Sequence, residues 1–133
     1  MLFPNTKQFY AEKVTKKGKP QGSEFTIFAS LVLANCDNDE EIFICSIGTG
    51  TKCIGYDLIE KDFNNGYLLH DCHAEIMARR SFIKFLFDLL ENSKCGLFFD
   101  WVEEDKKWKL KNNYELIMIL TELPCRFKQL TTF

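Results

Sequence analysis

Apolar and polar residues occur in blocks along this chain, and the blocks predict the order of its elements. Two apolar runs, residues 25–34 and 42–47, are separated by the acidic turn of residues 37–41. Short apolar runs on either side of a turn are typical of an antiparallel β-hairpin. A short helix is expected earlier, over residues 5–13, with Asn5 as its cap.

One long helix is predicted over residues 72–91. Apolar side chains lie nearly all round it, and its charged stripe consists of Arg80, Lys84, Asp88 and Glu91. A helix of this kind is usually buried between other elements. Arg79 and Arg80 are adjacent and face different directions, so at least one is expected to point inward, where an arginine needs an anionic partner.

Two further elements complete the predicted order. Residues 97–102 and 108–110 favour a small hairpin across residues 103–107. Residues 116–120 form an uninterrupted apolar run, which is typical of a central strand covered on both faces. Strands that combine with one long helix in this way predict an α/β fold.

Composition and charge narrow the class of protein. The chain has 133 residues and an apolar content of 46%, which predicts one domain with its own core. With a net charge of −2, the chain lacks the excess of basic residues that is typical of a general nucleic-acid binder, and we expect no DNA partner. No signal peptide or membrane span is visible, so no membrane partner is expected. Six cysteines without secretory features indicate reduced thiols in the cytoplasm or nucleus.

The candidate chemistry lies at the start of the long helix. The only two histidines, His70 and His73, precede it, and Glu75 follows His73 by two positions. Pro124 and Cys125 come later, after the last apolar run. His-x-Glu at a helix start, followed by Pro-Cys, is the signature of zinc-dependent nucleobase deaminases. In such a site imidazole and thiolate bind the metal, and a carboxylate that is no ligand moves protons.

Each part of this motif also has an ordinary explanation. His-x-Glu alone recurs by accident as a polar helix start, here with Asp71 as the cap. Cys125 alone is most simply an inert buried thiol. The combination favours His73 and Cys125 as metal ligands, because residues 116–120 carry Pro-Cys to a strand end, where open α/β sheets bind ligands.

A glycine-rich segment, residues 48–53, follows the first hairpin. Its glycines permit a ligand to approach the backbone closely, and Lys52 is a candidate phosphate contact. Turns use the same residues, so an ordinary turn is the alternative. The lysines of residues 13–19 predict a solvated loop, with a phosphate contact as the alternative.

Taken together, these motifs resemble the A-to-I editase domain, the family of adenosine deaminases that act on double-stranded RNA and on tRNA. The similarity covers nearly the whole chain, and its main motifs are Gly48 to Gly55, Asp71 to Ile76 with Arg79 to Phe82, and Leu123 to Cys125. Other segments are more similar to the tRNA-specific branch, namely residues 17–20, 25–26 and 108–110. The resemblance implies a cytidine-deaminase-like three-layer α/β/α fold. Residues 1–133 would hold its N-terminal portion, with the hairpin, the His-Ala-Glu helix and the central strand.

The resemblance also implies roles for single residues. His73 and Cys125 match zinc ligands, and Glu75 matches the proton shuttle. Thr51 and Lys52 match a loop that lies against the flipped nucleotide and its phosphates. The implied partner is tRNA or another structured RNA, and the implied reaction converts adenosine to inosine.

A second cofactor is implied by the same resemblance. Arg79 and Arg80 match positions that help to hold a buried inositol hexakisphosphate. Asp71 matches the acid that links this cofactor to the metal site. The implied cofactors are therefore Zn²⁺ and inositol hexakisphosphate.

The chain departs from the family pattern after Cys125. Arg126 and Phe127 stand where the family has Gly-Asp, and Lys128 stands where a Pro-Cys-x-x-Cys motif needs cysteine. Residues 126–133 are therefore a divergent tail, and His70 replaces the usual Asn. With the third zinc ligand absent, we expect impaired or no deamination from these residues alone. The alternatives are a non-catalytic RNA-binding remnant, a fragment of a deaminase gene model, or a structural zinc module.

Overall fold

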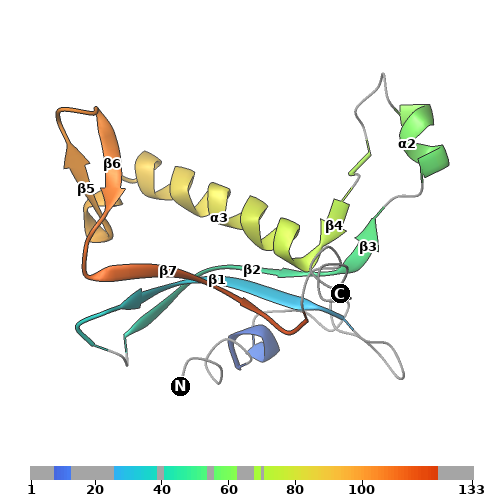
Figure 1. The fold of residues 1–133 in the computed structure, drawn as a ribbon, viewed down its shortest axis with the longest axis horizontal. Coiled ribbons are helices and arrows are strands. Elements are labelled where there is room, and N and C mark those ends of the chain that lie inside the picture. The colour runs from blue at the N-terminus through green and yellow to red at the C-terminus, as the bar shows by residue number, and fades with distance from the viewer. Residues whose placement is uncertain are drawn as a thin grey trace, which may run out of the picture.

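Strands and one long helix alternate through the part of the chain that the structure describes. The computed structural model describes residues 8–12, 26–38, 41–53, 56–62, 68–69 and 71–122. The elements are β1 (Phe28–Asn35), β2 (Ile42–Thr49), β3 (Thr51–Cys53), α2 (Tyr56–Asp62), β4 (Asp71–His73), α3 (Ala74–Glu91), η2 (Cys95–Leu97), β5 (Phe99–Val102), β6 (Lys107–Leu110) and β7 (Tyr114–Leu120) (Figure 1). The fold is therefore of the mixed α/β class.

The main sheet has three antiparallel strands in the order β2-β1-β7. β1 pairs with β2 from Phe28 opposite Thr49, which confirms the first predicted hairpin. On its other edge β1 pairs with β7, with Ala29 opposite Leu120. Residues 28–33 are all buried, because β1 has a neighbour on each edge and cover on each face.

β7 corrects the prediction that residues 116–120 form a central strand. Among the described strands, β7 lies at an edge of the sheet, and the central place belongs to β1. Leu116 and Met118 are exposed, so this strand is not covered on both faces. A continuous apolar run shows that a strand is able to be buried, but it carries no information on the number of neighbouring strands.

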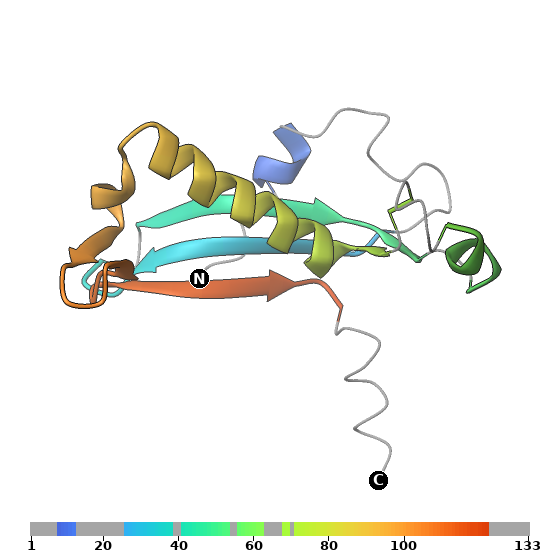
Figure 2. The ribbon, with the colours of Figure 1, turned by 90° about the horizontal axis from the view of Figure 1, so that it is seen from above.

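Helices contact both faces of this sheet. α3 lies along one face and packs mainly on β2 and β1 (Figures 1 and 2). On the opposite face, Tyr10 of the short helix over residues 8–12 meets Phe28 edge to face, with 5.3 Å between ring centroids. The arrangement is an incomplete form of the expected three-layer fold. The proposed helix cap Asn5 lies outside the described residues.

α3 differs from its prediction in two ways. It begins at Ala74 rather than at residue 72, because residues 71–73 form the strand β4. It is also largely exposed, and its buried residues are Ala74, Ala78 and Leu89. The prediction of a buried helix was wrong because, among the described residues, α3 packs mainly on the sheet and meets η2 only near its C-terminal end, which leaves its outer side exposed.

The second predicted hairpin is confirmed by β5 and β6. Phe99 pairs with Leu110 and Trp101 with Trp108. The hairpin stands at the C-terminal end of α3 and leads directly into β7 (Figure 1). No helix within the described ranges is long and apolar enough to cross a membrane. The lysine-rich segment of residues 13–19 lies outside those ranges.

Candidate functional site

The candidate residues meet where the chain passes from β4 into α3. β4 pairs antiparallel with β3, so Thr51 lies opposite His73 and Lys52 lies opposite Cys72. The backbone thus brings Thr51 and Lys52 beside His73, although α2 separates them in the sequence (Figure 1). Part of the segment predicted as a glycine-rich loop is therefore a strand, Thr51–Cys53.

Gly48 allows α3 to approach the sheet closely. A Cβ atom on Gly48 would lie 2.2 Å from the Ala74 carbonyl oxygen and 2.3 Å from the Ala78 backbone nitrogen. Real Cβ atoms do not tolerate such distances to backbone, so no larger residue fits without a shift of the helix. The space that the sequence suggested for a ligand is filled here by the chain's own helix.

Gly50 allows the backbone of β4 to approach closely, as Gly48 does for α3. Its φ of +148° favours glycine, and a Cβ atom would lie 2.1 Å from the Cys72 carbonyl oxygen. Its carbonyl oxygen also accepts a hydrogen bond from the Ala74 N–H at 3.1 Å. The sequence did not indicate these packing roles of the two glycines. For Gly48, the available signal is the pair Ala74 and Ala78, small residues four apart on one helix face.

Asp71 orients His73. The Asp71 Oδ1 atom accepts a hydrogen bond from the His73 backbone N–H at 2.9 Å and lies 2.9 Å from the ring Nδ1. The pKa of the Asp71 carboxyl is lowered, chiefly by that backbone N–H. A carboxylate on one ring nitrogen is the usual outer partner of a metal-binding histidine, and it leaves Nε2 for the metal.

The helix cap differs from the prediction, which assigned it to Asp71. His73 occupies the cap position with φ −62° and ψ 148°, and no side-chain hydrogen bond caps α3. If His73 and Glu75 were both helical, their side chains would point about 200° apart, because they are two positions apart in the sequence. Because His73 is extended and only Glu75 is helical, this constraint does not apply to the pair. Glu75 lies in the first turn of α3 and is half-buried.

Arg79 and Arg80 are both exposed, so the prediction that one of them points inward was wrong. The Arg80 Nη1 atom donates a hydrogen bond of 2.6 Å to the Asp71 carbonyl oxygen. This bond joins α3 to β4 directly behind His73. The sequence did not indicate it because the acceptor is a backbone atom, which no residue type marks.

An open groove lies between β2 and α3, next to Arg80. It has a volume of about 490 Å³ and is lined by Ile47, Gly48, Thr49, Met77, Arg80, Ser81 and Lys84. Lys84 also pairs with Asp88, with 3.0 Å between Nζ and Oδ1. Two cations and two hydroxyl groups give this groove the chemistry to bind an anion.

The metal-binding residues are only partly described. No group of three or more His, Cys, Asp or Glu side chains in the described ranges is placed to hold a metal ion. Cys125 lies outside those ranges, as does His70. Leu120 packs against Ala29, Ala74 and Ala78, so β7 ends beside the first turn of α3. Cys125 follows Leu120 by five residues, which span at most about 18 Å when extended.

Comparison with known proteins supports the resemblance to the editase domain independently of the geometry. Residues 46–130, which contain all the candidate residues, match the adenosine-deaminase (editase) domain. The chain is 36% identical to tRNA-specific adenosine deaminase 1 of Drosophila melanogaster over 114 residues, which cover 86% of this chain and 27% of that protein.

Two further relatives extend the comparison. The sequence identity to human tRNA-specific adenosine deaminase 1 is 32% over 133 aligned residues, which cover 89% of this chain and 26% of that protein. Identity to the double-stranded RNA-specific editase Adar of Drosophila melanogaster is 28%, with 82% of this chain and 17% of that protein covered. The chain spans about a quarter of the length of the tRNA-specific relatives.

Proposed function

Because the chain belongs to the adenosine-deaminase (editase) domain family, we propose that it is the N-terminal portion of an enzyme that converts adenosine to inosine in tRNA. The observation that carries the proposal is the Asp71–His73 pair immediately before Glu75 at the start of α3. The reaction is a hydrolysis that consumes one water and releases ammonia. An RNA substrate agrees with an intracellular place of action, in the cytoplasm or nucleus.

We assign zinc binding to His73 and Cys125. Their imidazole and thiolate groups are donors that zinc prefers, and the bond from Asp71 to Nδ1 favours metal binding through Nε2. When bound, zinc supplies an activated water for attack on the adenine ring. Catalytic zinc normally has three protein ligands, and these residues provide two. The 133 residues alone are therefore expected to have little or no activity.

Glu75 is the proposed proton shuttle. Its carboxylate takes a proton from the attacking water and delivers it to the departing amine, which leaves as ammonia. The partial exposure of Glu75 is compatible with this role, because the shuttle must reach solvent and substrate in turn. The position of Glu75 on the first turn also keeps it close to His73 in the chain.

The proposal also includes residues that bind two polyanions, the RNA backbone and inositol hexakisphosphate. Thr51 and Lys52, which pair with β4, are assigned to the RNA phosphates. Arg79, Arg80 and Asp71 are assigned to inositol hexakisphosphate. The exposure of Arg79 and Arg80, and the groove lined by Arg80, Lys84 and two hydroxyl groups, support this assignment.

A zinc-binding measurement tests the proposal on the chain itself. The purified protein is titrated with Zn²⁺ against a chromophoric chelator. His73→Ala and Cys125→Ser should each weaken binding, because each removes one of the two donors. Cys36→Ser is the matched control, since Cys36 is an exposed cysteine in the turn after β1. Equal affinities for Cys125→Ser and the unaltered chain would remove Cys125 from the site.

A further inference from the structure

The outer side of α3 carries an apolar stripe that consists of Ile83, Phe87 and Leu90. These residues are spaced at i, i+4 and i+7, so they share one side of the helix. They are 38%, 64% and 49% exposed, and no large apolar side chain in the described part of the chain is more exposed than Phe87. The same spacing forms the contact seam between paired helices in coiled coils. The stripe is therefore suited to packing against a second helix.

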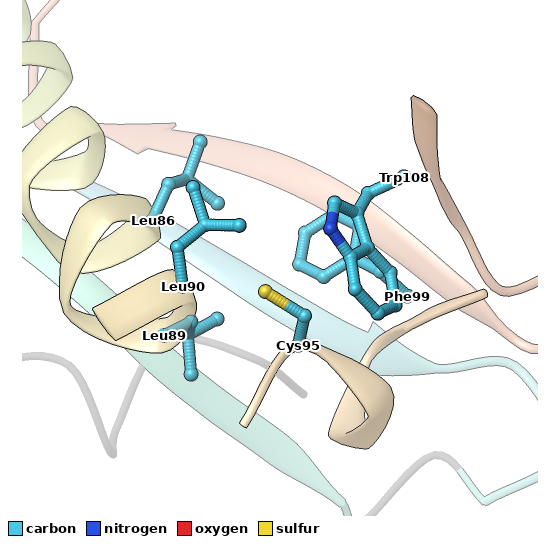
Figure 3. Close-up of a pocket in the computed structure, with 6 residues that line it drawn as sticks. All are labelled: Leu86, Leu89, Leu90, Cys95, Phe99 and Trp108. Atoms are coloured by element: carbon cyan, nitrogen blue, oxygen red, sulfur yellow. The ribbon is translucent and has the colours of Figure 1, made fainter. Parts of the chain in front are cut away.

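The apolar surface continues from α3 onto the β5–β6 hairpin. The two elements share a pocket of about 170 Å³, whose walls are Leu86, Leu89, Leu90, Cys95, Phe99 and Trp108. Figure 3 shows the leucines of α3 on one side of this pocket and the aromatic rings of the hairpin on the other. Trp101 contacts Trp108 edge to face, with 5.5 Å between ring centroids, and both indoles are exposed. One continuous apolar surface therefore extends from Ile83 to Trp101.

The charged residues beside the stripe are divided by sign along α3. Arg80 and Lys84 precede Phe87, whereas Asp88 and Glu91 follow it, and all four are exposed. A second α3 in antiparallel orientation would bring the positive half of each helix opposite the negative half of the other. A parallel second helix would place like charges together, which is unfavourable. Lys84 already pairs with Asp88 within the chain, but an exposed pair contributes little, so new partners cost little.

We propose that a second copy of this chain packs on the apolar surface of α3, with the two α3 helices antiparallel about a two-fold axis beside Phe87. Ile83 of each copy then lies opposite Leu90 of the other copy, because Phe87 stands near the middle of the stripe. A two-fold dimer uses the same patch on both copies, so this patch must be complementary to itself. The apolar stripe and the division of charge both meet this condition, and neither depends on deaminase activity.

The size of the apolar surface agrees with a dimer. Five of its large side chains are between 38% and 64% exposed, namely Ile83, Phe87, Leu90, Trp101 and Trp108. An aromatic side chain has about 150–250 Å² of surface, so half-exposed side chains of this size leave roughly 100 Å² each, or about 500 Å² together. An interface of standard size buries about 800 Å² per partner, of which about 56–58%, or roughly 450 Å², is non-polar. The exposed apolar area is therefore sufficient for one partner of this kind.

Sedimentation velocity of the complete chain over a range of concentrations tests the dimer, with a chelator present so that zinc has no part. The unaltered chain should form a dimer as its concentration rises. Phe87→Glu should raise the dissociation constant on the order of 100-fold or more, because it places a charge at the centre of the interface in both copies. Leu58→Glu is the matched control and should leave the constant unchanged. Leu58 is 51% exposed on α2, at the opposite end of the molecule from the hairpin (Figure 1).

Charge reversal tests the antiparallel orientation and decides the matter if Phe87→Glu fails to fold. Lys84→Glu should weaken the dimer roughly fivefold at low salt, because residue 84 then faces Asp88 and Glu91 of the second copy. In a parallel dimer residue 84 would face residue 84, and its reversal would leave the repulsion unchanged. Mixing Lys84→Glu with a chain that carries Asp88→Lys and Glu91→Lys should give a dimer tighter than either variant forms alone.

Four results would overturn the dimer or its orientation. A chain that stays monomeric at every concentration has no such interface. Open-ended assemblies would contradict a two-fold interface, which closes on two copies. Equal effects of Phe87→Glu and Leu58→Glu would remove the stripe from the contact. An unchanged dissociation constant in Lys84→Glu, with no tighter dimer on mixing, would exclude the antiparallel orientation.

Discussion

At the scale of single residues, the Asp71 carboxylate organises the candidate site. It accepts the His73 backbone N–H and lies at hydrogen-bonding distance from Nδ1 of the ring. Arg80 holds the backbone of Asp71 from the side of α3. The imidazole is thus oriented by groups within one short segment of chain.

Asp71→Asn should reduce zinc affinity roughly 10- to 100-fold, the effect typical of outer partners of metal-binding histidines. The substitution keeps the size of the side chain but removes its charge. Asp88→Asn is the matched control, because the Asp88 carboxylate pairs with Lys84 on the exposed part of α3. Zinc competition with a chelator measures both variants, and a loss of the same size in each would contradict the role of Asp71.

Cys45 should resist alkylation at pH 8, whereas Cys36 should react. Burial raises the pKa of Cys45 from 9.0 to about 12, so its thiol stays protonated where an exposed thiol begins to ionise. Cys36 is exposed. Peptide mapping by mass spectrometry after treatment with N-ethylmaleimide compares the two. Rapid modification of Cys45 in the folded chain would show that its thiol is accessible.

The same pKa shift predicts a loss of stability in alkali. The unfolded chain releases the Cys45 proton near pH 9.0, while the folded chain retains it to about pH 12. A raised pKa in the folded chain contributes stability that is fully present below the pKa of the unfolded chain. This contribution is lost as the pH rises from 9.0 towards about 12. Urea unfolding at pH 8 and pH 11 should show a smaller decrease for Cys45→Ala than for the unaltered chain.

At the scale of elements, the close contact between β2 and α3 determines where the site lies. Gly48 lies under Ala74 and Ala78, and Gly50 lies under the carbonyl of Cys72. These two contacts place β4 and the first turn of α3 against the end of the main sheet. The glycine-rich segment therefore acts on the site through the backbone.

Gly48→Ala should destabilise the fold by about 1–3 kcal/mol or more, because the added methyl group overlaps with backbone atoms of α3 that cannot rotate away. Gly96→Ala is the matched control, since no atom lies within 4 Å of a Cβ built at Gly96. Urea unfolding compares the two variants. Similar midpoints for both would show that α3 moves aside without cost.

Arg80→Ala should lower the free energy of unfolding by about 0.5–1.5 kcal/mol, the net contribution of one hydrogen bond. The bond lost is the one from Arg80 to the Asp71 carbonyl oxygen. Arg79→Ala removes the same charge from the adjacent exposed position and should change stability by less than about 0.5 kcal/mol. Equal losses would indicate a general charge effect instead.

At the scale of the whole molecule, the described part is a sheet with one well-covered strand and two edge strands. Apolar side chains remain exposed on the outer side of α3 and on β7, among them Ile83, Phe87, Leu116 and Met118. Exposed apolar surface of this kind marks a place where another segment or molecule binds.

The chain alone should form no inosine when it is incubated with tRNA, zinc and inositol hexakisphosphate. The reason is that its proposed metal site has two of the three ligands that catalytic zinc normally has. Glu75→Gln provides the background, because it removes the proton shuttle without removing a ligand. Inosine above that background would show that another residue of the chain completes the site.

The sequence predicted the elements and the motif because both depend on residues close together in the chain. The hairpins formed by residues 28–49 and 99–110, the helix ending at Glu91 and the family of the His-x-Glu motif were all recognisable from local patterns. Turn residues, apolar periodicity and short motifs act over a few positions. The boundaries were less certain, and the strand β4 was missed because its three residues are too few to show a period.

The tertiary structure alone decided which elements become neighbours and which side chains they expose. The pairing of β1 with β7 placed β7 at the sheet edge, and it joins segments separated by most of the chain. The exposure of Arg79 and Arg80 followed from the limited cover over α3. The close contacts of Gly48 and Gly50 involve backbone atoms, which all residue types share. Such relations depend on packing in three dimensions, and for this reason the sequence determined the chemistry of the site but not its surroundings.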